Sequence, residues 1–243
     1  QNTATHGGGI HIMNGADPTF TDITISNNEA GQGGGILIYG SNTDPVFTNI
    51  ILSQNTAAEG GGLCIGEGAD PTFTNITISN NEANGYGGGI LIYANNTDPM
   101  FTNMTVSQNT AIQGGGIHIR NDAEPTFFNV TITGNSVSGN DGGGVFIYNV
   151  QSTVFTNTIL WDNSPQEIFF YWDGSSSSIT ITYSDIQGGE EGIVTNDNGT
   201  VNWLDGNIDS NPLFTDAANG DYHLSDYSPA IGAGTSDGAP TTD

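Results

Sequence analysis

The stretch Gly33-Gly34-Gly35-Ile36-Leu37-Ile38-Tyr39 decides the fold, because variants of it recur along the chain. Three consecutive glycines followed by an aliphatic residue begin at Gly7, Gly33, Gly60, Gly87, Gly114 and Gly142. The differences between these positions are 26, 27, 27, 27 and 28 residues. A fixed period of about 20 to 50 residues is typical of proteins that stack one supersecondary unit. The sequence therefore predicts a repeat protein whose function depends on what the repeats bring into line.

Each repeat contains three short runs in which apolar residues alternate with polar ones. In the second repeat these runs contain Ile36 and Ile38, then Phe47, then Ile50 and Leu52. Alternation is the period of a half-buried strand, and Gly, Asn, Asp and Ser between the runs are turn residues. Three short strands in about 27 residues predict one coil of a parallel β-helix. The predicted fold is all-β, a single right-handed parallel β-helix.

The coils fall into a regular and an irregular part. Residues 1–163 keep the period, and residues 16–65 and 69–119 match so closely that the duplicated unit is two coils. Residues 164–243 are expected to form irregular coils and a C-terminal cap, because a solenoid must cover its last hydrophobic layer. Candidate covering side chains are Tyr222, Leu224, Tyr227 and Ile231. The first residues, 1–4, match mid-repeat residues, so the chain is expected to begin partway through a repeat.

Composition narrows the function. There are 26 acidic residues against one basic residue, Arg120, and the formal net charge is −25. Nucleic acids and anionic membranes are contacted by Lys and Arg, so neither is an expected partner. The single cysteine, Cys64, allows no internal disulfide. No run of about 18 apolar residues is present, so no membrane insertion is expected.

Four segments after residue 180 resemble the C-terminal part of secreted bacterial right-handed β-helix proteins. They are Tyr183–Gly189, Gly206–Phe214, Gly220–Leu224 and Ser228–Gly234. Many proteins of that kind end in a surface-anchoring or secretion-sorting domain. The repeated Gly-Gly-Gly-Ile and Phe-Thr-Asn also loosely resemble the repeats of polymorphic outer-membrane adhesins. The resemblance implies the β-helix fold and an extracellular or cell-surface location in bacteria.

Two columns of asparagine are expected, because stacking coils about 4.8 Å apart turns each repeat position into a column. Stacked amides can donate and accept along the column and also satisfy turn backbone, so we interpret both as structural ladders. The alternative is ligand binding or glycosylation, since Asn75, Asn95, Asn103, Asn129 and Asn198 begin Asn-x-Ser/Thr triplets. One column is Asn49, Asn75, Asn103, Asn129 and Asn157, with Asp22 at its start. The other is Asn28, Asn55, Asn81, Asn109, Asn135 and Asn163.

A carboxylate column lies beside the repeated prolines. Its members are Asp17, Asp44, Asp70, Asp98 and Glu124. Like charges about 5 Å apart repel by roughly 0.8 kcal/mol even in bulk water. Bonding of each Asp to its own turn N–H would relieve this repulsion, and so would bridging by Ca²⁺. Calcium is therefore a candidate ligand of Asp17, Asp44, Asp70 and Asp98.

The positions that should face solvent on the Gly-Gly-Gly strands are apolar or aromatic. If Ile36 and Ile38 face the core, the outward positions include Leu37, Tyr39, Leu91, Tyr93, His118, Phe146 and Tyr148. An exposed strip of this kind usually marks a contact surface. It could contact a partner chain or neighbouring domain, be covered by the protein's own loops, or stack on glycan rings.

No catalytic constellation is predicted. The only acidic cluster outside the repeats is Asp185, Glu190 and Glu191, and the histidines show no metal-binding spacing. The sequence therefore favours a non-enzymatic structural or adhesive β-solenoid, expected to be a protomer of a surface fibre assembled end to end or laterally. Its partners would be other copies of itself, neighbouring domains of a longer chain, or surface glycans. The alternative is a carbohydrate-binding or polysaccharide-degrading β-helix protein.

Overall fold

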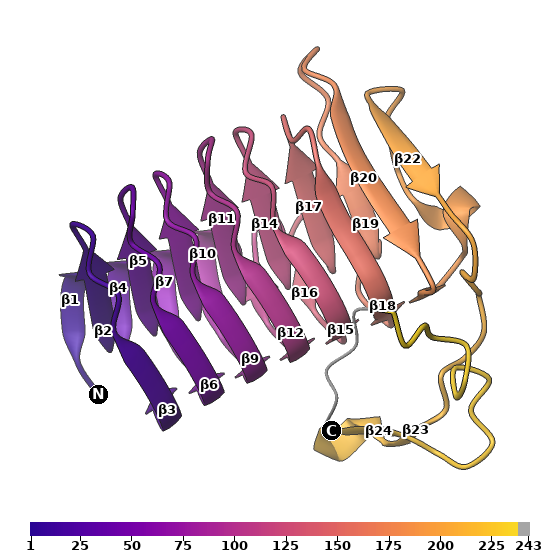
Figure 1. Ribbon diagram of the computed structural model, residues 1–243, viewed down its shortest axis with the longest axis horizontal. Helices are drawn as coiled ribbons and strands as arrows, with labels where there is room; N and C mark the ends of the chain where they lie inside the picture. The colour runs from indigo at the N-terminus through magenta and orange to yellow at the C-terminus, as the bar shows by residue number, and fades with distance from the viewer. Residues whose placement is uncertain (238–243) are drawn as a thin grey trace.

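The computed structural model describes residues 1–237, whose strands wind in successive coils around one axis (Figure 1). Regular coils contribute one strand to each of three parallel sheets, here called sheets A, B and C. The predicted all-β parallel solenoid is confirmed. Sheet A contains β1 (Thr3–His6), β4 (Glu29–Gln32), β7 (Thr56–Glu59), β10 (Glu82–Tyr86), β13 (Thr110–Ala111) and β16 (Ser136–Val137). Sheet B contains β2 (Ile10–Met13), β5 (Ile36–Tyr39), β8 (Leu63–Gly66), β11 (Ile90–Tyr93), β14 (Ile117–Arg120), β17 (Val145–Tyr148) and β19 (Ile168–Phe170).

Sheet C has the longest strands and extends furthest toward the C-terminus. It contains β3 (Thr19–Ser26), β6 (Val46–Ser53), β9 (Thr72–Ser79), β12 (Met100–Ser107), β15 (Thr126–Thr133), β18 (Thr153–Trp161), β20 (Ser177–Thr182), β21 (Asp185–Ile186) and β22 (Gly199–Trp203). In Figure 1 its strands run side by side across the front of the molecule. This sheet therefore carries the longest continuous outer face.

Single residues in the left-handed backbone region turn the chain at the corners of each coil. In one regular coil, φ is +57° at Asn49, +56° at Gln54 and +64° at Gly60. Asn49 bends β6 in its middle, Gln54 follows the end of β6, and Gly60 begins the turn from sheet A into sheet B. Gly and Asn tolerate this region better than most residues, which explains why they recur at the same repeat positions.

The core is a stack of similar layers, and its phenylalanine column is the same in successive coils. Phe47 pairs with Phe73, and Phe73 with Phe101, in exact parallel register, with ring centroids 4.7 and 5.1 Å apart. The stack continues to Phe20 at one end and to Phe155 at the other. Offset aromatic stacking adds about 0.5–1.5 kcal/mol per pair beyond the burial of apolar area. The interior thus repeats with the period predicted from the sequence.

The second glycine of each triplet lets neighbouring turns touch. A β-carbon added to Gly88 would lie 2.4 Å from the carbonyl oxygen of Thr110 and 2.5 Å from that of Gly115. Real β-carbons do not approach backbone oxygens so closely, so any larger residue would push the coils apart. The glycines are required by close packing along the axis.

After β22 the chain leaves the coils and folds back beside sheet C. It forms the hairpin of β23 (Phe214–Asp216) and β24 (Asp221–Leu224), seen below the coils in Figure 1. The returning segment is tied to the solenoid by Asn157, whose Oδ1 accepts the Thr235 N–H and whose Nδ2 donates to the Thr235 carbonyl, both at 2.8 Å. Two of the side chains expected to cover the last layer do not, because Tyr227 is 90% exposed and Ile231 is 55% exposed.

Candidate functional site

The turn from sheet A into sheet B makes a concave corner on the outside of the solenoid. A β-carbon added to Gly60 would lie 2.7 Å from Cβ of Cys64, and one added to Gly114 would lie 2.7 Å from Cβ of His118. The first glycine of a triplet therefore faces the outward side chain of the following sheet B strand. Outward side chains of the two sheets meet along this corner, which we call the A–B corner.

The prediction of an exposed strip on sheet B is wrong for the column that contains Leu37, Leu91, His118 and Phe146, because these side chains are buried. Leu37 is 1% exposed, Leu91 0%, and His118 and Phe146 are each 2% exposed. These side chains point away from the core, but they form the floor of the A–B corner and are covered there. Leu37, Cys64 and Leu91 form a second hydrophobic cluster, and partly buried tyrosines pack on it: Tyr39, Tyr86 and Tyr93. The protein's own side chains therefore cover this column.

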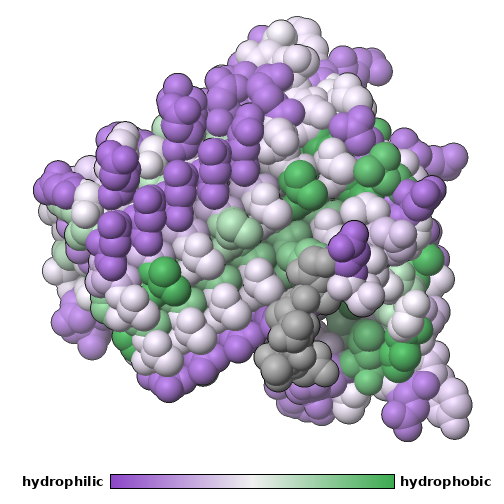
Figure 2. Space-filling model, in the orientation of Figure 1, coloured by the Kyte–Doolittle hydropathy of each residue, from purple (hydrophilic) through white to green (hydrophobic). Residues whose placement is uncertain are grey.

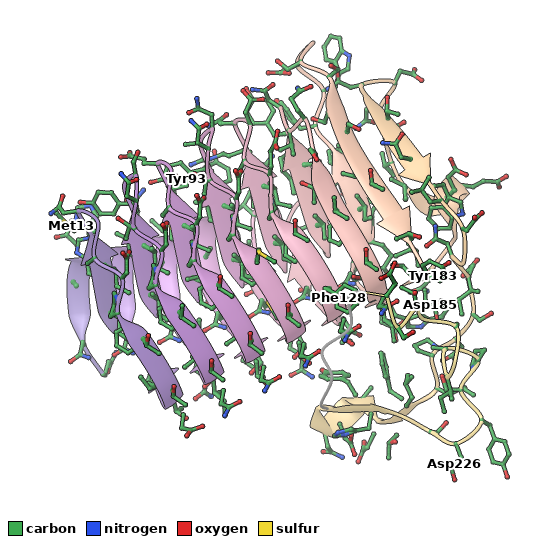
Figure 3. The ribbon with its side chains drawn as sticks, in the orientation of Figure 1. Met13, Tyr93, Phe128, Tyr183, Asp185 and Asp226 are labelled. Atoms are coloured by element: carbon green, nitrogen blue, oxygen red, sulfur yellow. The ribbon has the colours of Figure 1, made fainter. Side chains whose placement is uncertain are left out.

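The tyrosine column beside it keeps part of its surface open. Tyr39, Tyr93 and Tyr148 are all half-buried. Tyr39 stacks on His11 at 5.4 Å, and Tyr148 meets Tyr171 edge to face at 5.6 Å. Figure 3 places Tyr93 at the edge of sheet B where the loops leave the coils. A contact role for this column remains a prediction.

Arg120, the only basic residue besides the histidines, lies in the middle of the A–B corner. Its guanidinium carbon lies 5.0 Å from the ring centroid of Tyr86 and 5.6 Å from that of Tyr93, within the range of cation–π attraction. Its Nη2 lies 3.5 Å from Oε2 of Glu59, and its buried Nε has no hydrogen-bond partner in the described part of the chain. The guanidinium is held mainly by aromatic faces, and its hydrogen-bonding capacity is only partly used.

His118 lies beneath Arg120 as an uncharged ring. It stacks on Phe146 with ring centroids 4.4 Å apart and lies 5.1 Å from the ring of Tyr86. Burial, reinforced by the nearby charge of Arg120, lowers the pKa of His118 to about 3. Both ring nitrogens are buried, and neither makes a hydrogen bond of good geometry within residues 1–237. His118 therefore behaves as a flat, neutral floor for the corner.

A pocket of about 250 Å³ opens above this floor, and we call it the Arg120 pocket. It collects side chains from four successive coils. One of its lining side chains, Tyr171, is 40% exposed, and the next residue in the chain, Trp172, is 66% exposed. The lining residues are Tyr86, Gln113, His118, Arg120, Phe146, Tyr148 and Tyr171.

The sequence reasoning missed Tyr86, Gln113 and Tyr171. The first two immediately precede a glycine triplet, and this position forms a column along the outer end of sheet A: Gln32, Glu59, Tyr86, Gln113 and Asp141. Counting back one residue from each triplet would have found this column. Tyr171 follows the shortened strand β19 outside the regular period, so no repeat position predicts it.

The buried asparagine ladder is confirmed. Oδ1 of Asn109 accepts hydrogen bonds from the backbone N–H and the side-chain Nδ2 of Asn81, at 2.8 and 3.0 Å. Its own Nδ2 donates to Oδ1 of Asn135 at 2.9 Å and to the carbonyl of Ile78 at 3.0 Å. The same Asn-to-Asn bonds link every member: Asn28, Asn55, Asn81, Asn109, Asn135 and Asn163.

A second ladder runs along the outer face of sheet C, where Figure 2 shows continuous hydrophilic rows. Asn49 donates from Nδ2 to Oδ1 of Asp22 at 2.8 Å, and each following Asn donates to the one before. The chain of amides runs through Asn49, Asn75, Asn103, Asn129 and Asn157. In the members that begin glycosylation triplets, the amide nitrogen is therefore already used in the ladder.

The aspartate column is satisfied between coils. Oδ1 of Asp17 accepts the N–H of Asp44 at 2.7 Å, and Oδ1 of Asp70 accepts that of Asp98 at 2.7 Å. The prediction that each carboxylate accepts the N–H of its own turn is wrong. Each of these carboxylates accepts a backbone N–H of the next coil instead. Within residues 1–237, no three His, Cys, Asp or Glu side chains gather in a group that could hold a metal ion. A calcium role stays a proposal.

The acidic cluster outside the repeats is not brought together. Asp185 is 3% exposed and lines a cavity of about 660 Å³ between sheet C and the returning C-terminal segment, near Tyr183 in Figure 3. Its Oδ1 accepts the Ser210 N–H at 3.0 Å, Oδ2 has no hydrogen-bond partner among residues 1–237, and burial raises the pKa of the carboxyl group to about 6. Glu190 and Glu191 are exposed and do not line this cavity.

These features define the class of the molecule: a three-sheet parallel β-solenoid with internal amide ladders. Residues 1–127 and 92–228 match the family described as "Right handed beta helix region", so the chain belongs to that family. No curated protein and no solved structure matches the chain significantly. In the part of the chain that the structure describes, no helix is long and apolar enough to cross a membrane.

Proposed function

We propose that this chain is a structural and adhesive β-solenoid of the bacterial cell exterior or cell surface, acting as a stiff protomer of a fibre. The observation that carries this proposal is the buried amide ladder, which links consecutive coils from Asn28 to Asn163 without a break. The phenylalanine stack and the outer ladder run in parallel with it. Three continuous columns oppose bending and shear between coils, as a mechanical element requires.

Partners of the fibre would be other copies of the chain or neighbouring domains of a longer protein. Because Leu37 and Leu91 are covered, lateral contact falls to the half-buried tyrosines and to the loop that carries Tyr171 and Trp172. Axial contact would use backbone groups at the ends of the stack. Calcium bound along the exposed Asp column would add to such contacts by removing repulsion between the carboxylates.

Electron microscopy of negatively stained protein, with and without a calcium chelator, tests this proposal. We expect rods of uniform width, longer than one chain, at high protein concentration. Shortening of the rods on chelation would assign calcium to assembly. Short single particles at every protein and calcium concentration would contradict the fibre.

Polysaccharide degradation on the same scaffold has less support. Glycoside hydrolysis uses two carboxyl groups about 5–10 Å apart across the scissile bond. Asp185 has the raised pKa of a general acid, yet no second carboxylate lines its cavity among residues 1–237. Sugar binding without turnover has a separate basis in the Arg120 pocket.

A further inference from the structure

We propose that the Arg120 pocket binds one terminal sugar ring of a neutral glycan. This inference goes beyond the mechanical role, because it depends on the outer surface of the A–B corner and not on the ladders. The geometry that supports it has three parts: an aromatic wall, a complementary pair of polar groups, and the charge around them.

The aromatic wall suits the C–H face of a pyranose ring. Tyr148 and Tyr171 both line the pocket, and they meet edge to face at 5.6 Å, so their ring planes are nearly perpendicular. The carboxylate of Asp173 lies close enough to the Tyr148 hydroxyl to raise the pKa of that hydroxyl. Trp172, the residue after Tyr171, is 66% exposed but does not line the pocket among the described residues. Sugar C–H groups pack on the electron-rich faces of such rings.

The polar groups of the pocket match a hydroxyl. The 3.5 Å contact of Arg120 with Glu59 is long for a charge-assisted hydrogen bond, which is typically about 2.7–2.9 Å, so guanidinium donors remain available. Gln113 uses its Nε2 to donate to Oδ2 of Asp141 at 3.0 Å, which leaves its Oε1 as an acceptor. A sugar hydroxyl both donates and accepts, so it can satisfy Arg120 and Gln113 together.

The surrounding charge favours a neutral sugar over an acidic one. Arg120 already lies beside Glu59, and the rest of the chain carries a large negative charge. A uronate or sialic acid would therefore bring its carboxylate toward Glu59 and Asp141 with only one cation to compensate. His118 adds no charge to the floor because it is neutral, and its sealed nitrogens do not contact the ligand.

The size of the pocket limits how much of a glycan it can enclose. Its volume of about 250 Å³ is below the range of roughly 300–1,000 Å³ that encloses drug-sized ligands. One ring fits, and the adjoining residues of a glycan chain would lie outside the pocket. Millimolar affinity is expected for a single ring, and repetition of the protein along a fibre would raise the avidity.

Because the sequence contains a single arginine, the guanidinium Nε–H signal in a ¹H–¹⁵N NMR spectrum reports on this pocket alone. We would titrate the protein with methyl glucoside, methyl mannoside, methyl galactoside and N-acetylglucosamine, and separately with glucuronic and galacturonic acid, each to about 100 mM. At least one neutral sugar should shift the signal saturably. Both uronic acids should bind at least about tenfold more weakly. Absence of any saturable shift with the neutral sugars, or tighter binding of a uronic acid, would overturn the proposal.

Matched variants separate the pocket from the rest of the tyrosine column. Tyr171→Ala should weaken binding of the best neutral sugar by about tenfold or more, because a stacking face is lost. Tyr39→Ala, in the same column as Tyr148 but outside the pocket, should leave binding unchanged. Arg120→Lys keeps the charge but loses the planar set of guanidinium donors, and it should also weaken binding. Because this variant has no guanidinium signal, binding is measured on the ligand by saturation-transfer NMR. An equal loss in Tyr39→Ala and Tyr171→Ala would contradict the assignment.

Discussion

The carboxylate of Glu167 binds both donors of Asn163: Oε1 accepts the backbone N–H at 3.0 Å, and Oε2 accepts the side-chain Nδ2. These are the two bonds that the next asparagine would make in a regular coil. Glu167 is 6% exposed, so the ladder ends on a buried acid. The repeat stops here without leaving the last amide unsatisfied.

The terminal acid should make stability depend on pH. Burial raises the pKa of Glu167 from 4.5 to about 7 in the folded protein. The folded state therefore holds this proton more tightly, so the contribution is fully present below pH 4.5 and is lost as pH rises to 7. The loss is at most roughly 3 kcal/mol. Urea unfolding at pH 5, 6, 7 and 8 should show a smaller pH dependence for Glu167→Gln than for the wild type.

A matched control for this pH effect is Glu190→Gln, which changes an exposed acid in the same part of the chain. Asp185, whose pKa is also raised, remains in both variants and contributes equally. Parallel pH profiles for Glu167→Gln and the wild type would show that Glu167 does not hold the proton.

The buried ladder should matter more for stability than the outer one. Asn109→Ala leaves the backbone N–H of Asn81 and one of its two Nδ2 hydrogens buried without an acceptor, so we expect a loss of roughly 2–4 kcal/mol. Asn75→Gly removes two bonds on the exposed face while keeping the left-handed backbone, and should cost under about 1 kcal/mol. Urea unfolding of both variants measures the difference. Equal losses would mean that the ladder bonds do not depend on burial.

Close contact between successive turns should make the second glycine of a triplet irreplaceable. Gly88→Ala forces a β-carbon against two carbonyl oxygens and should cost more than about 3 kcal/mol or prevent folding. Gly139→Ala is the control, because the nearest atom would lie at 3.4 Å. Soluble yield and thermal unfolding compare the two. A stable Gly88→Ala protein would show that the coils can separate locally.

The burial of the A–B corner by its tyrosines can be tested through Cys64, the only thiol of the protein. Cys64 is fully buried, and burial raises the pKa of its thiol, so a thiol reagent at pH 8 should react at least about 100-fold more slowly than in urea. Tyr86→Ala removes part of the cover and should accelerate the reaction without unfolding the protein. Similar rates in the native and urea-unfolded wild type would contradict the closed corner.

Much of this fold could be predicted because each coil repeats the same local chemistry. The period of the glycine triplets predicted the solenoid. Asparagines such as Asn81 and Asn109 recur with that same period, which predicted the buried ladder. Alternation along a strand separates inward from outward side chains, but it does not encode the shape of the cross-section. Leu37 and Leu91 therefore appeared exposed, although the concave corner buries them.

The Arg120 pocket could not be predicted from the repeat pattern for a related reason. Its walls come from Tyr86, Arg120 and Tyr171, which lie on different coils at different repeat positions. Glu167 lies only four residues after Asn163, but it occupies no repeat position, so the column pattern did not indicate its contact with the ladder. Sequence reasoning worked where residues share a column and failed where irregular segments supply the partner.

The opposite directions of the two amide ladders have an electrostatic consequence. In the buried ladder the Asn-to-Asn bond of each Nδ2 points toward the C-terminal coils, while its second hydrogen bonds a carbonyl of the preceding coil; in the outer ladder the Asn-to-Asn bond points toward the N-terminal coils. Aligned amides sum to a macrodipole whose positive pole is the donor end, as in a helix. Glu167 lies at one positive pole and Asp22 at the other, so each dipole is capped by a carboxylate. The two dipoles are antiparallel and largely cancel along the axis, so coils can be added without building up a field between the two ends.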